Sequence, residues 1–349
     1  MKFDNFELDF SGKTKTQTIL EIGVNHNGSI EIAKDMVLEI KKRGGDIVKF
    51  QAFIAEEEIS IHAEKANYQK ETTGKTGGQL EMAKDLELTF EELSQMRDFC
   101  FELKIPFLCT AFDSKSLEFL IKDLNVKSLK VASSEVTALP FLAEIAKTNV
   151  DIILSTGASD LEEVARAIKI IENNRIDSEL IIMHCLSEYP APLEQINLKA
   201  MKTMAKAFGY PVGYSDHTVG VQAPILAAGL EACSVEKHFT LNRNMEGPDH
   251  LASIEPKEMS DMINGIRNCR AMLGNGIKKP SKAELPQIQL IRKSIVSKKN
   301  LKKGHIISVD DLALKRPAIG LDPKYLDILI GRELKKDLNE DEPLSWKVI

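Results

Sequence analysis

Two histidines, His217 and His238, each end a short segment that is typical of a β-strand. The segment between them, residues 219–230 (VGVQAPILAAGL), is apolar and rich in small residues, which predicts a helix connecting two parallel strands. Side chains alternate along a strand, so we expect Ser215 and His217 on one face, and Glu236 and His238 likewise. Two imidazoles at the ends of neighbouring strands suit a divalent metal that keeps water or substrate oxygens as its other ligands.

The alternative is that each histidine only makes a hydrogen bond in a polar loop. The spacing between His217 and His238 matches no known ligand motif, so it does not exclude this alternative. Asp216 and Lys237 are expected on the opposite face of the same two strands. The metal interpretation therefore depends on the fold that positions the strand ends.

Short apolar, β-branched segments alternate with longer amphipathic segments from residue 18 onward. The strand-like segments are residues 18–23, 46–50, 106–110, 128–132, 151–155, 180–184, 211–215 and 233–238. The helix-like segments are residues 30–42, 90–103, 114–124, 138–148, 160–173, 198–207 and 219–230. This alternation predicts an α/β fold, a (β/α)₈ or TIM barrel.

In such barrels the chemistry gathers at the C-terminal ends of the strands. The polar residues predicted there are Glu21, Lys49, Gln51, Thr110, Lys130, Ser133, Glu135, Ser155, His184, Ser215, His217, Glu236 and His238. A charged residue within an apolar segment is costly unless it is paired or binds a ligand. Two lysines with several hydroxyls at one mouth therefore predict an anion site, although a buried structural ion pair is the alternative for either lysine.

The composition limits the function. The 349 residues are 43% hydrophobic and 28% charged, which fits one large α/β barrel with a small appendage. A net charge of −6 argues against nucleic-acid binding. No apolar run reaches the roughly 18 residues of a membrane span, and an acidic N-terminal segment differs from a signal peptide. Five scattered cysteines without CxxC spacing fit reduced thiols, so we expect a cytoplasmic protein.

Two segments interrupt the alternation. Residues 54–88 form the longest connection, and long loops after barrel strands tend to be lids or substrate walls, with a mobile insertion as the alternative. Proline, lysine and glycine accumulate near residues 275–287, which indicates a domain boundary. We expect a catalytic barrel over residues 1–278, a linker over 279–290 and a small domain over 291–349. The latter begins with a basic segment that is read as a solvated face.

Several motifs lie at the predicted strand ends and in the loops that follow. They are EIGVNHNGS (21–29), VKFQAF (48–53), Tyr68-Gln69, QLEM (79–82), KVASSE (130–135), ILSTG (153–157), HCLSEYPAP (184–192), GYSDHT (213–218), EKHFTLNRNMEGPDHLAS (236–253) and KRPAIG (315–320). Together they resemble the sialic acid synthase family, which includes the N-acetylneuraminate and legionaminic acid synthases. The resemblance covers nearly the whole chain.

The resemblance implies a barrel followed by an antifreeze-like (SAF) domain, which covers the active site of the other subunit in a domain-swapped homodimer. It implies a transferase that condenses phosphoenolpyruvate with an N-acetylated amino sugar of the N-acetylmannosamine type. The products are a nine-carbon nonulosonic acid and phosphate. The implied cofactor is a divalent metal on His217 and His238, manganese in most relatives, with magnesium or cobalt as alternatives.

The resemblance also assigns residues. Positions that match phosphoenolpyruvate contacts are Lys49, Thr110, Lys130, Ser133, Ser155 and Ser215. Positions that match sugar contacts are Glu21, Gln51, Tyr189, Asp249 and Arg316 of the partner subunit. With the two histidines, Glu21 and Glu236 complete the expected catalytic set, and their order in the proton transfers stays open.

Three positions depart from the family pattern: Ala111 replaces a frequent proline, Ser187 an asparagine of some relatives, and Ser134 a frequent glycine. Other functions also stay open. The sugar could be 2,4-diacetamido-2,4,6-trideoxymannose, as in an N,N'-diacetyllegionaminate synthase. A metal-dependent barrel aldolase or hydrolase would use the same histidines without phosphoenolpyruvate. A non-catalytic carbohydrate-binding protein is a third alternative.

Overall fold

The structure, a computed structural model, describes residues 1–73 and 77–349, without the side chains of residues 67, 68 and 71. Tyr68, expected in the lid, and the middle of the glycine-rich segment after it therefore lie outside what is described. The chain forms two compact units, Met1–Gly274 and Asn275–Ile349.

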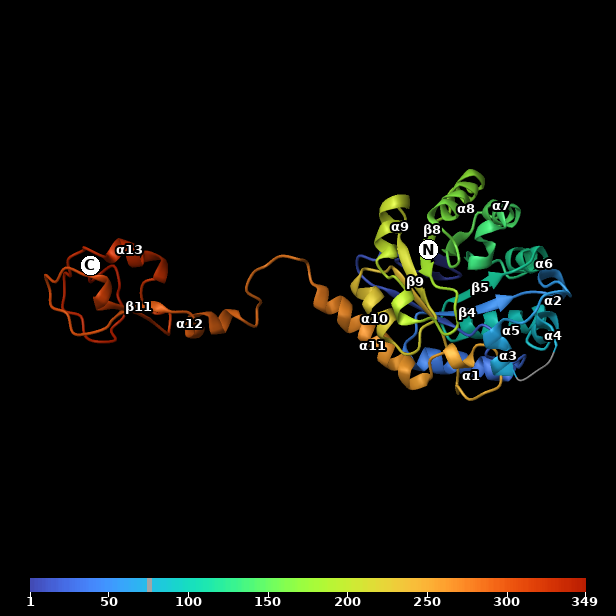
Figure 1. Cartoon of the computed structure of the whole chain (residues 1–349), viewed down its shortest axis with the longest axis horizontal. Coiled ribbons are helices and arrows are strands. Elements are labelled where there is room, and N and C mark those ends of the chain that lie inside the picture. Colours follow the sequence, from blue (N-terminus) through green and yellow to red (C-terminus); the bar gives the residue numbers. More distant parts are fainter. Residues whose placement is uncertain (74–76) are drawn as a thin grey trace. The chain divides into compact units, whose positions relative to one another are not determined.

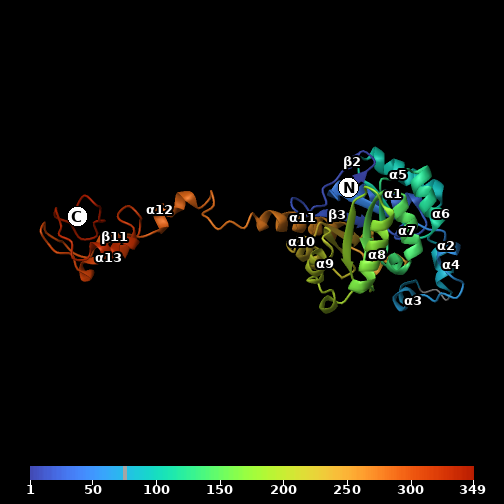
Figure 2. The ribbon, with the colours of Figure 1, turned by 90° about the horizontal axis from the view of Figure 1, so that it is seen from above.

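The first unit contains a closed barrel of eight parallel strands, in the order β10-β3-β4-β5-β6-β7-β8-β9. The strands are β3 (Gln17–Glu21), β4 (Ile47–Ala52), β5 (Phe107–Ala111), β6 (Ser128–Val131), β7 (Asp151–Ser155), β8 (Leu180–Cys185), β9 (Val212–Asp216) and β10 (Ser234–His238). Helices surround the strands (Figure 1, Figure 2). The predicted TIM barrel is confirmed, because each predicted strand segment overlaps a barrel strand.

All but the last of the surrounding helices follow predicted amphipathic segments. They are α1 (Ile30–Arg43), α5 (Phe90–Glu102), α6 (Ser114–Glu118), α7 (Leu139–Lys147), α8 (Leu161–Asn174), α9 (Ala200–Phe208), α10 (Gln222–Gly229) and α11 (Pro256–Leu273). Helix α8 shows why. The Asp160 side chain caps its first turn, and Val164, Ala167, Ile168 and Ile171 recur at helical spacing on its buried face. Helix α6 continues as a π-helix, so the predicted helix over 114–124 is not regular throughout.

The long connection after β4 contains three short helices among its described residues. They are α2 (Ala55–Glu58), α3 (Asn67–Thr73) and α4 (Gln79–Lys84). Ala55 and Ala83 pack with Phe53 in a small apolar cluster beside the barrel mouth. This segment therefore forms a wall next to the ends of β3, β4 and β5.

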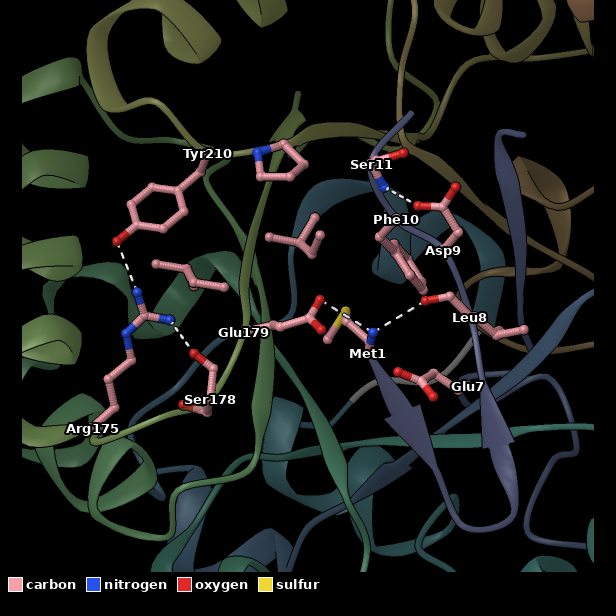
Figure 3. A pocket seen from close by; sticks show the side chains of 13 residues that line it. Met1, Glu7, Leu8, Asp9, Phe10, Ser11, Arg175, Ser178, Glu179 and Tyr210 are labelled. Carbon is pink, nitrogen blue, oxygen red and sulfur yellow. Dashed lines mark hydrogen bonds and ion pairs between the residues drawn. The ribbon is translucent and has the colours of Figure 1, made fainter. Parts of the chain in front are cut away.

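A hairpin of β1 (Lys2–Phe3) and β2 (Phe6–Glu7) closes the N-terminal end of the barrel. Met1, Phe3 and Phe10 pack against residues from the starts and interiors of five strands and against Cys233: Ile19, Ile47, Leu108, Ile153, Ile181, Met183 and Cys233. A cavity of about 810 Å³ lies beside this hairpin, lined in part by Met1, Glu179 and Arg175 (Figure 3). Leu180, the first residue of β8, also lines this cavity. The cavity therefore lies at the end of the barrel where the strands begin, opposite to their carboxyl ends.

The second unit has its own small core. Strands β11 (Ser294–Ser297) and β12 (Leu312–Lys315) pair antiparallel, and short helices α12 (Ile288–Ile291) and α13 (Leu326–Leu329) accompany them. The core residues are Ile295, Leu301, Ile307, Leu312, Leu321, Leu329, Leu334, Leu338, Leu344 and Ile349. Across the described residues of the chain, no helix has both the length and the apolar character required to cross a lipid bilayer.

Candidate active site

A cavity of about 520 Å³ opens at the C-terminal ends of the barrel strands. Thirteen residues of the barrel that were predicted to bind substrate or metal or to act in catalysis line it: Glu21, Lys49, Gln51, Thr110, Lys130, Ser133, Ser155, Tyr189, Ser215, His217, Glu236, His238 and Asp249. The barrel register explains this convergence, because Glu21 pairs with both Lys49 and His238 on neighbouring strands. The larger cavity beside the N-terminal hairpin lies at the wrong end of the barrel for this chemistry.

Two lysines supply positive charge inside this cavity, and both are buried. Lys49 Nζ lies 2.9 Å from Glu21 Oε1 and 3.5 Å from Glu236 Oε1. Lys130 Nζ lies 3.9 Å from Glu236 Oε2 and donates a hydrogen bond of 2.6 Å to Ser155 Oγ. Both lysines are therefore in buried ion pairs, which was the alternative to an anion site. They also line an open cavity that an anion can enter.

Burial opposes the charge on each lysine, but with different results. Glu21 and Glu236 outweigh burial at Lys49 and raise its pKa. At Lys130 burial dominates, and its pKa is lowered. A phosphate or carboxylate that enters the cavity would supply negative charge and so stabilise the charged form of Lys130.

The two buried glutamates have different environments. Burial raises the pKa of Glu21, although Lys49 opposes it. Burial also favours the neutral form of Glu236, but Lys130 and Lys49 outweigh it and lower its pKa. Oε2 of each glutamate is buried without a hydrogen-bond partner among the described residues. Each carboxyl group therefore keeps one oxygen for a ligand or a proton.

The two predicted metal-binding histidines lie close together on the cavity wall. Their ring centroids are 5.5 Å apart, and the Tyr189 ring lies 4.0 Å from that of His217. Nδ1 of His217 lies 2.8 Å from the carbonyl oxygen of Leu186 and donates to it, which leaves Nε2 with a lone pair. Nδ1 of His238 is buried without a hydrogen-bond partner among the described residues and lies 3.6 Å from Asp249 Oδ2.

These donors fit a divalent cation. Burial lowers the pKa of His238 well below its ordinary value, so its ring is neutral and can act as a ligand. Burial acts in the same direction at His217, but the neighbouring Cys185 and the Leu186 carbonyl oxygen outweigh it and raise the pKa of His217, so a metal bound there would displace a proton. Within the described part of the chain, no group of three or more His, Cys, Asp and Glu side chains is arranged to hold a metal. Two imidazoles would therefore leave the remaining coordination positions to water and substrate.

Hydroxyl groups and a glycine shape the cavity beside Lys130. The Gly157 N–H donates a hydrogen bond of 2.8 Å to Ser133 Oγ. A Cβ at Gly157 would lie 2.1 Å from Ser187 Oγ and 2.9 Å from Ser133 Oγ, so no larger residue fits there without displacing both serines. Ser187, one of the departures from the family pattern, thus lies at the wall of the cavity.

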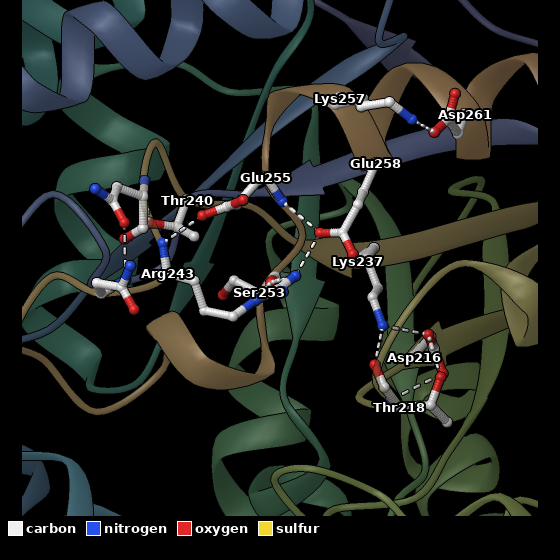
Figure 4. A network of polar contacts seen from close by, with 12 residues as sticks. Asp216, Thr218, Lys237, Thr240, Arg243, Ser253, Glu255, Lys257, Glu258 and Asp261 are labelled. Atoms are coloured by element: carbon white, nitrogen blue, oxygen red, sulfur yellow. Dashed lines mark hydrogen bonds and ion pairs between the residues drawn. The ribbon is translucent and has the colours of Figure 1, made fainter.

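A buried network lies on the other face of β9 and β10, as the alternation of side chains predicted. Lys237 Nζ lies 2.5 Å from Asp216 Oδ2 and also donates to the Thr218 carbonyl oxygen (Figure 4). The Tyr214 hydroxyl donates to Asp216 at 2.9 Å. This network joins the two strands at the positions next to His217 and His238.

Some residues of the cavity were not among those predicted: Gln79, Phe112, Ala132, Ser134, Ala158, Cys185 and Ser187. Cys185, one of the five cysteines expected to be reduced thiols, has its Sγ 3.8 Å from His217 Nδ1. Its position at the end of a predicted strand was the signal that could have found it. Conversely, His184 and Glu135 do not line the cavity, and His184 Nε2 bonds the Ile196 carbonyl oxygen at 2.7 Å. Arg316 is exposed in the second unit.

Comparisons with known proteins agree with this geometry. The sequence pattern of the NeuB family matches residues 36–278, and that of the SAF domain matches residues 292–349. The N,N'-diacetyllegionaminic acid synthase of Legionella pneumophila is 43% identical over 95% of this chain and 94% of its own length. The enzyme of the same name from Campylobacter jejuni is 43% identical over 94% of this chain and 98% of its own length.

A solved structure shows the same fold. The N-acetylneuraminic acid synthetase of Leptospira borgpetersenii, in complex with citrate, superposes with a TM-score of 0.72 at 29% identity. The match covers 82% of this chain and 94% of that one. The resemblance noted in the sequence is thereby confirmed, and the chain belongs to the NeuB family of sialic acid synthases.

Proposed function

We propose that this protein condenses phosphoenolpyruvate with an N-acetylated amino sugar to give a nine-carbon nonulosonic acid and phosphate. The observation that carries the proposal is the cavity itself. It brings together buried Lys49 and Lys130, several hydroxyl groups, and the imidazoles of His217 and His238.

The donor is proposed to bind at the lysines. Phosphoenolpyruvate carries a phosphate and a carboxylate, and Lys49 and Lys130 can pair with both. Thr110, Ser133, Ser155 and Ser215 would supply further hydrogen bonds from the same wall. Because the two lysines and two glutamates together carry no net charge when all are ionised, an anionic donor favours protonation of one carboxylate. Glu21 is the candidate for that proton, since its pKa is raised.

The acceptor is proposed to bind between the histidines and the lid wall, in contact with Gln51, Tyr189 and Asp249. His217 and His238 would hold a divalent cation, which we propose to be manganese, and when bound it supplies Lewis acidity at the sugar aldehyde. Burial and then the neighbouring Glu21 raise the pKa of Asp249 to about 6. Asp249 can therefore accept hydrogen bonds from sugar hydroxyls at neutral pH and is ready to take up a proton below it.

The reaction can be written with residues of the chain in defined roles. C3 of phosphoenolpyruvate attacks the aldehyde carbon, and Glu21 donates a proton to the aldehyde oxygen. Water then adds to the cation left at C2, and Glu236 accepts the proton that the water loses. The C2–O bond to phosphate breaks last while the C2 hydroxyl passes its proton to the departing phosphate, which releases phosphate and the keto acid.

Two features of the assembly belong to the same proposal. We propose a domain-swapped homodimer in which Arg316 of the partner subunit contacts the sugar. We also propose the division into a barrel (1–278), a linker (279–290) and a SAF domain (291–349), in a cytoplasmic enzyme.

The test is the release of phosphate from phosphoenolpyruvate in the presence of manganese and an amino sugar, with the product identified by its mass. N-acetylmannosamine and 2,4-diacetamido-2,4,6-trideoxymannose are the two acceptors of first interest, the latter because relatives named as legionaminic acid synthases share 43% identity. If the protein turns over neither of these acceptors and no other amino sugar, an aldolase or hydrolase becomes the better interpretation.

A further inference from the structure

The loop between β10 and α11, residues 239–255, carries Asp249, which is proposed above to contact the amino sugar. Backbone hydrogen bonds hold the two ends of this loop together. The Thr240 N–H donates to the Ile254 carbonyl oxygen at 3.0 Å, and the Ile254 N–H donates to the His238 carbonyl oxygen at 2.9 Å. Asp249 lies between these ends, so further contacts must set its position on the cavity wall.

The side chain next to Asp249 in sequence, that of His250, bridges two loops at the mouth of the barrel. Its ring is fully buried. Nε2 lies 3.1 Å from Asn27 Oδ1, in the loop after β3, and Nδ1 lies 2.7 Å from Thr240 Oγ1, just after β10. Because β3 and β10 are neighbours in the barrel, the ring ties the middle of its own loop to both strand ends.

Asn27 fixes the direction of these hydrogen bonds. Its Nδ2 donates to the Glu246 carbonyl oxygen at 2.9 Å, which leaves Oδ1 as the acceptor that faces His250. Nε2 of His250 therefore carries the proton, and Nδ1 accepts from the Thr240 hydroxyl. Burial lowers the pKa of His250 to about 4, in agreement with a neutral ring. With one donor and one acceptor both in use, the ring has a single orientation.

The backbone around Asp249 is fixed as well. Ser253 Oγ donates to the Asp249 carbonyl oxygen at 2.7 Å, and Asn25 Nδ2 donates to Ser253 Oγ at 2.8 Å. The Asp249 carboxylate lines the active-site cavity, and its Oδ2 lies 3.6 Å from His238 Nδ1. The carboxylate is therefore held from its own backbone and from the neighbouring side chain.

The space around the His250 ring is full. A Cβ at Gly247 would lie 2.6 Å from His250 Cδ2 and 2.9 Å from Asn27 Oδ1. The glycine thus lets the loop backbone press against the ring and against the amide that orients it. Because the ring cannot turn in this space, a change of its shape has to move the backbone that carries Asp249.

We propose that His250, held by Asn27 and Thr240, is a positioning residue for the Asp249 carboxylate, a role that rests on the function proposed above. His250 does not line the active-site cavity, so it acts through Asp249 and not by contact with a substrate. Asp249 faces the acceptor, whereas the donor is assigned to the two lysines. Loss of the His250 contacts should therefore weaken acceptor binding and leave donor binding nearly unchanged.

The experiment measures kcat and both KM values by phosphate release, with manganese and the amino sugar that the wild type turns over best. His250→Phe is expected to raise KM for the sugar about tenfold and to leave KM for phosphoenolpyruvate nearly unchanged. His250→Gln retains a donor and an acceptor, so the rise should be only about threefold.

A double-mutant cycle separates positioning from general damage. In an Asp249→Ala background, His250→Phe should cause little further loss, because the group that it positions is absent. Titration calorimetry with the same sugar gives the dissociation constants where turnover is too slow to measure.

A second variant covers the case in which thermal unfolding shows that His250→Phe does not fold. Asn27 has a φ of 52°, a conformation that suits glycine, so Asn27→Gly removes both of its side-chain hydrogen bonds without backbone strain. It should raise KM for the sugar about fivefold. The matched control is Asn125→Gly, at an exposed asparagine of the same φ that lies before β6, and it should react as the wild type.

The possible results distinguish this proposal from the proposed function. Additive losses in the cycle, equal rises of both KM values in His250→Phe, or an Asn27→Gly protein that reacts like Asn125→Gly would overturn the positioning role. Each of these leaves the synthase activity standing. If the wild type releases phosphate with no amino sugar, the proposed function fails, and the positioning role fails with it.

Discussion

Lys237 and Asp216 form a fully buried ion pair, Nζ to Oδ2 2.5 Å, at paired positions of β10 and β9. Each residue immediately precedes one of the two histidines of the active site, His217 just after the end of β9 and His238 at the end of β10. Thr218 completes the network by donating to Asp216 Oδ2 at 3.0 Å. The pair thus links the two strands on the face opposite to the cavity.

The first prediction concerns this pair. Lys237→Met leaves the Asp216 carboxylate buried without its cation, which should lower the free energy of unfolding of the barrel by about 3–5 kcal/mol. The double variant Asp216→Leu/Lys237→Met removes both charges and should recover most of that loss. Denaturant unfolding of the three proteins measures the difference.

The control for this prediction is Lys257→Met, which breaks the exposed pair of Lys257 with Asp261 at 2.8 Å. Exposed pairs contribute little, so no measurable change is expected. A Lys237→Met protein as stable as Lys257→Met would show that the buried pair does not hold the strands.

The second prediction concerns pH. Burial lowers the pKa of His26 to about 4, and its Nδ1 accepts a hydrogen bond from the Gly28 N–H at 3.0 Å, which requires the neutral ring. The unfolded chain binds a proton near the ordinary pKa of 6.5. Between these values the unfolded state binds more protons, so stability falls as the pH falls through this window. The contribution at pH 5 is about 2 kcal/mol relative to pH 7.

His26→Gln should flatten this dependence, because an amide does not take up the proton. Unfolding free energies of both proteins at pH 7, 6 and 5 make the comparison. Some dependence should remain, since burial also lowers the pKa of His250 to about 4. Parallel curves for the variant and the wild type would contradict the assignment to His26.

The fold was predictable from the sequence where local signals and the barrel agree. Each strand, such as DIILS at 151–155, is a short apolar segment bounded by polar residues, and all eight are present. Helix α11 was not identified, although Pro256 in its first turn, a Glu255–Glu258 capping box and the spacing of Met259, Met262, Ile263 and Ile266 were available signals. The N-terminal hairpin was also missed, because two-residue strands have no measurable period.

The candidate site was predictable to the extent that it depends on strand ends. The strand register sets how far along the barrel axis each side chain lies, and the alternation of side chains sets whether it points into the barrel. These two rules bring together four residues at the cavity: His217, His238, Lys49 and Lys130. The pKa of Glu21 is raised and that of Glu236 is lowered, and this difference was not predictable. It depends on the distances of the two carboxyl groups to the lysines, which no sequence pattern gives.

The third prediction concerns the histidines. His217→Ala and His238→Ala should each abolish metal-dependent turnover without unfolding the protein, since each removes one of two proposed ligands. Manganese binding, followed by titration calorimetry, should weaken by at least about tenfold in each variant. Full activity of the metal-stripped double variant would exclude the metal role.

The fourth prediction concerns Arg316. Arg316→Ala should raise KM for the amino sugar about tenfold or more and leave KM for phosphoenolpyruvate nearly unchanged, because a planar guanidinium can hold sugar oxygens by two hydrogen bonds. Mixed with His217→Ala subunits, Arg316→Ala subunits should regain part of the activity, since one mixed site is complete. No recovery in exchanged dimers would argue against an arginine that acts in the neighbouring subunit.

The most direct test of the central claim is a crystal structure of the protein with manganese and phosphoenolpyruvate, recorded with anomalous scattering. The account predicts one anomalous peak within bonding distance of a ring nitrogen of both His217 and His238, with phosphoenolpyruvate bound at Lys49 and Lys130. A peak that contacts neither histidine, or phosphoenolpyruvate bound away from both lysines, would contradict it.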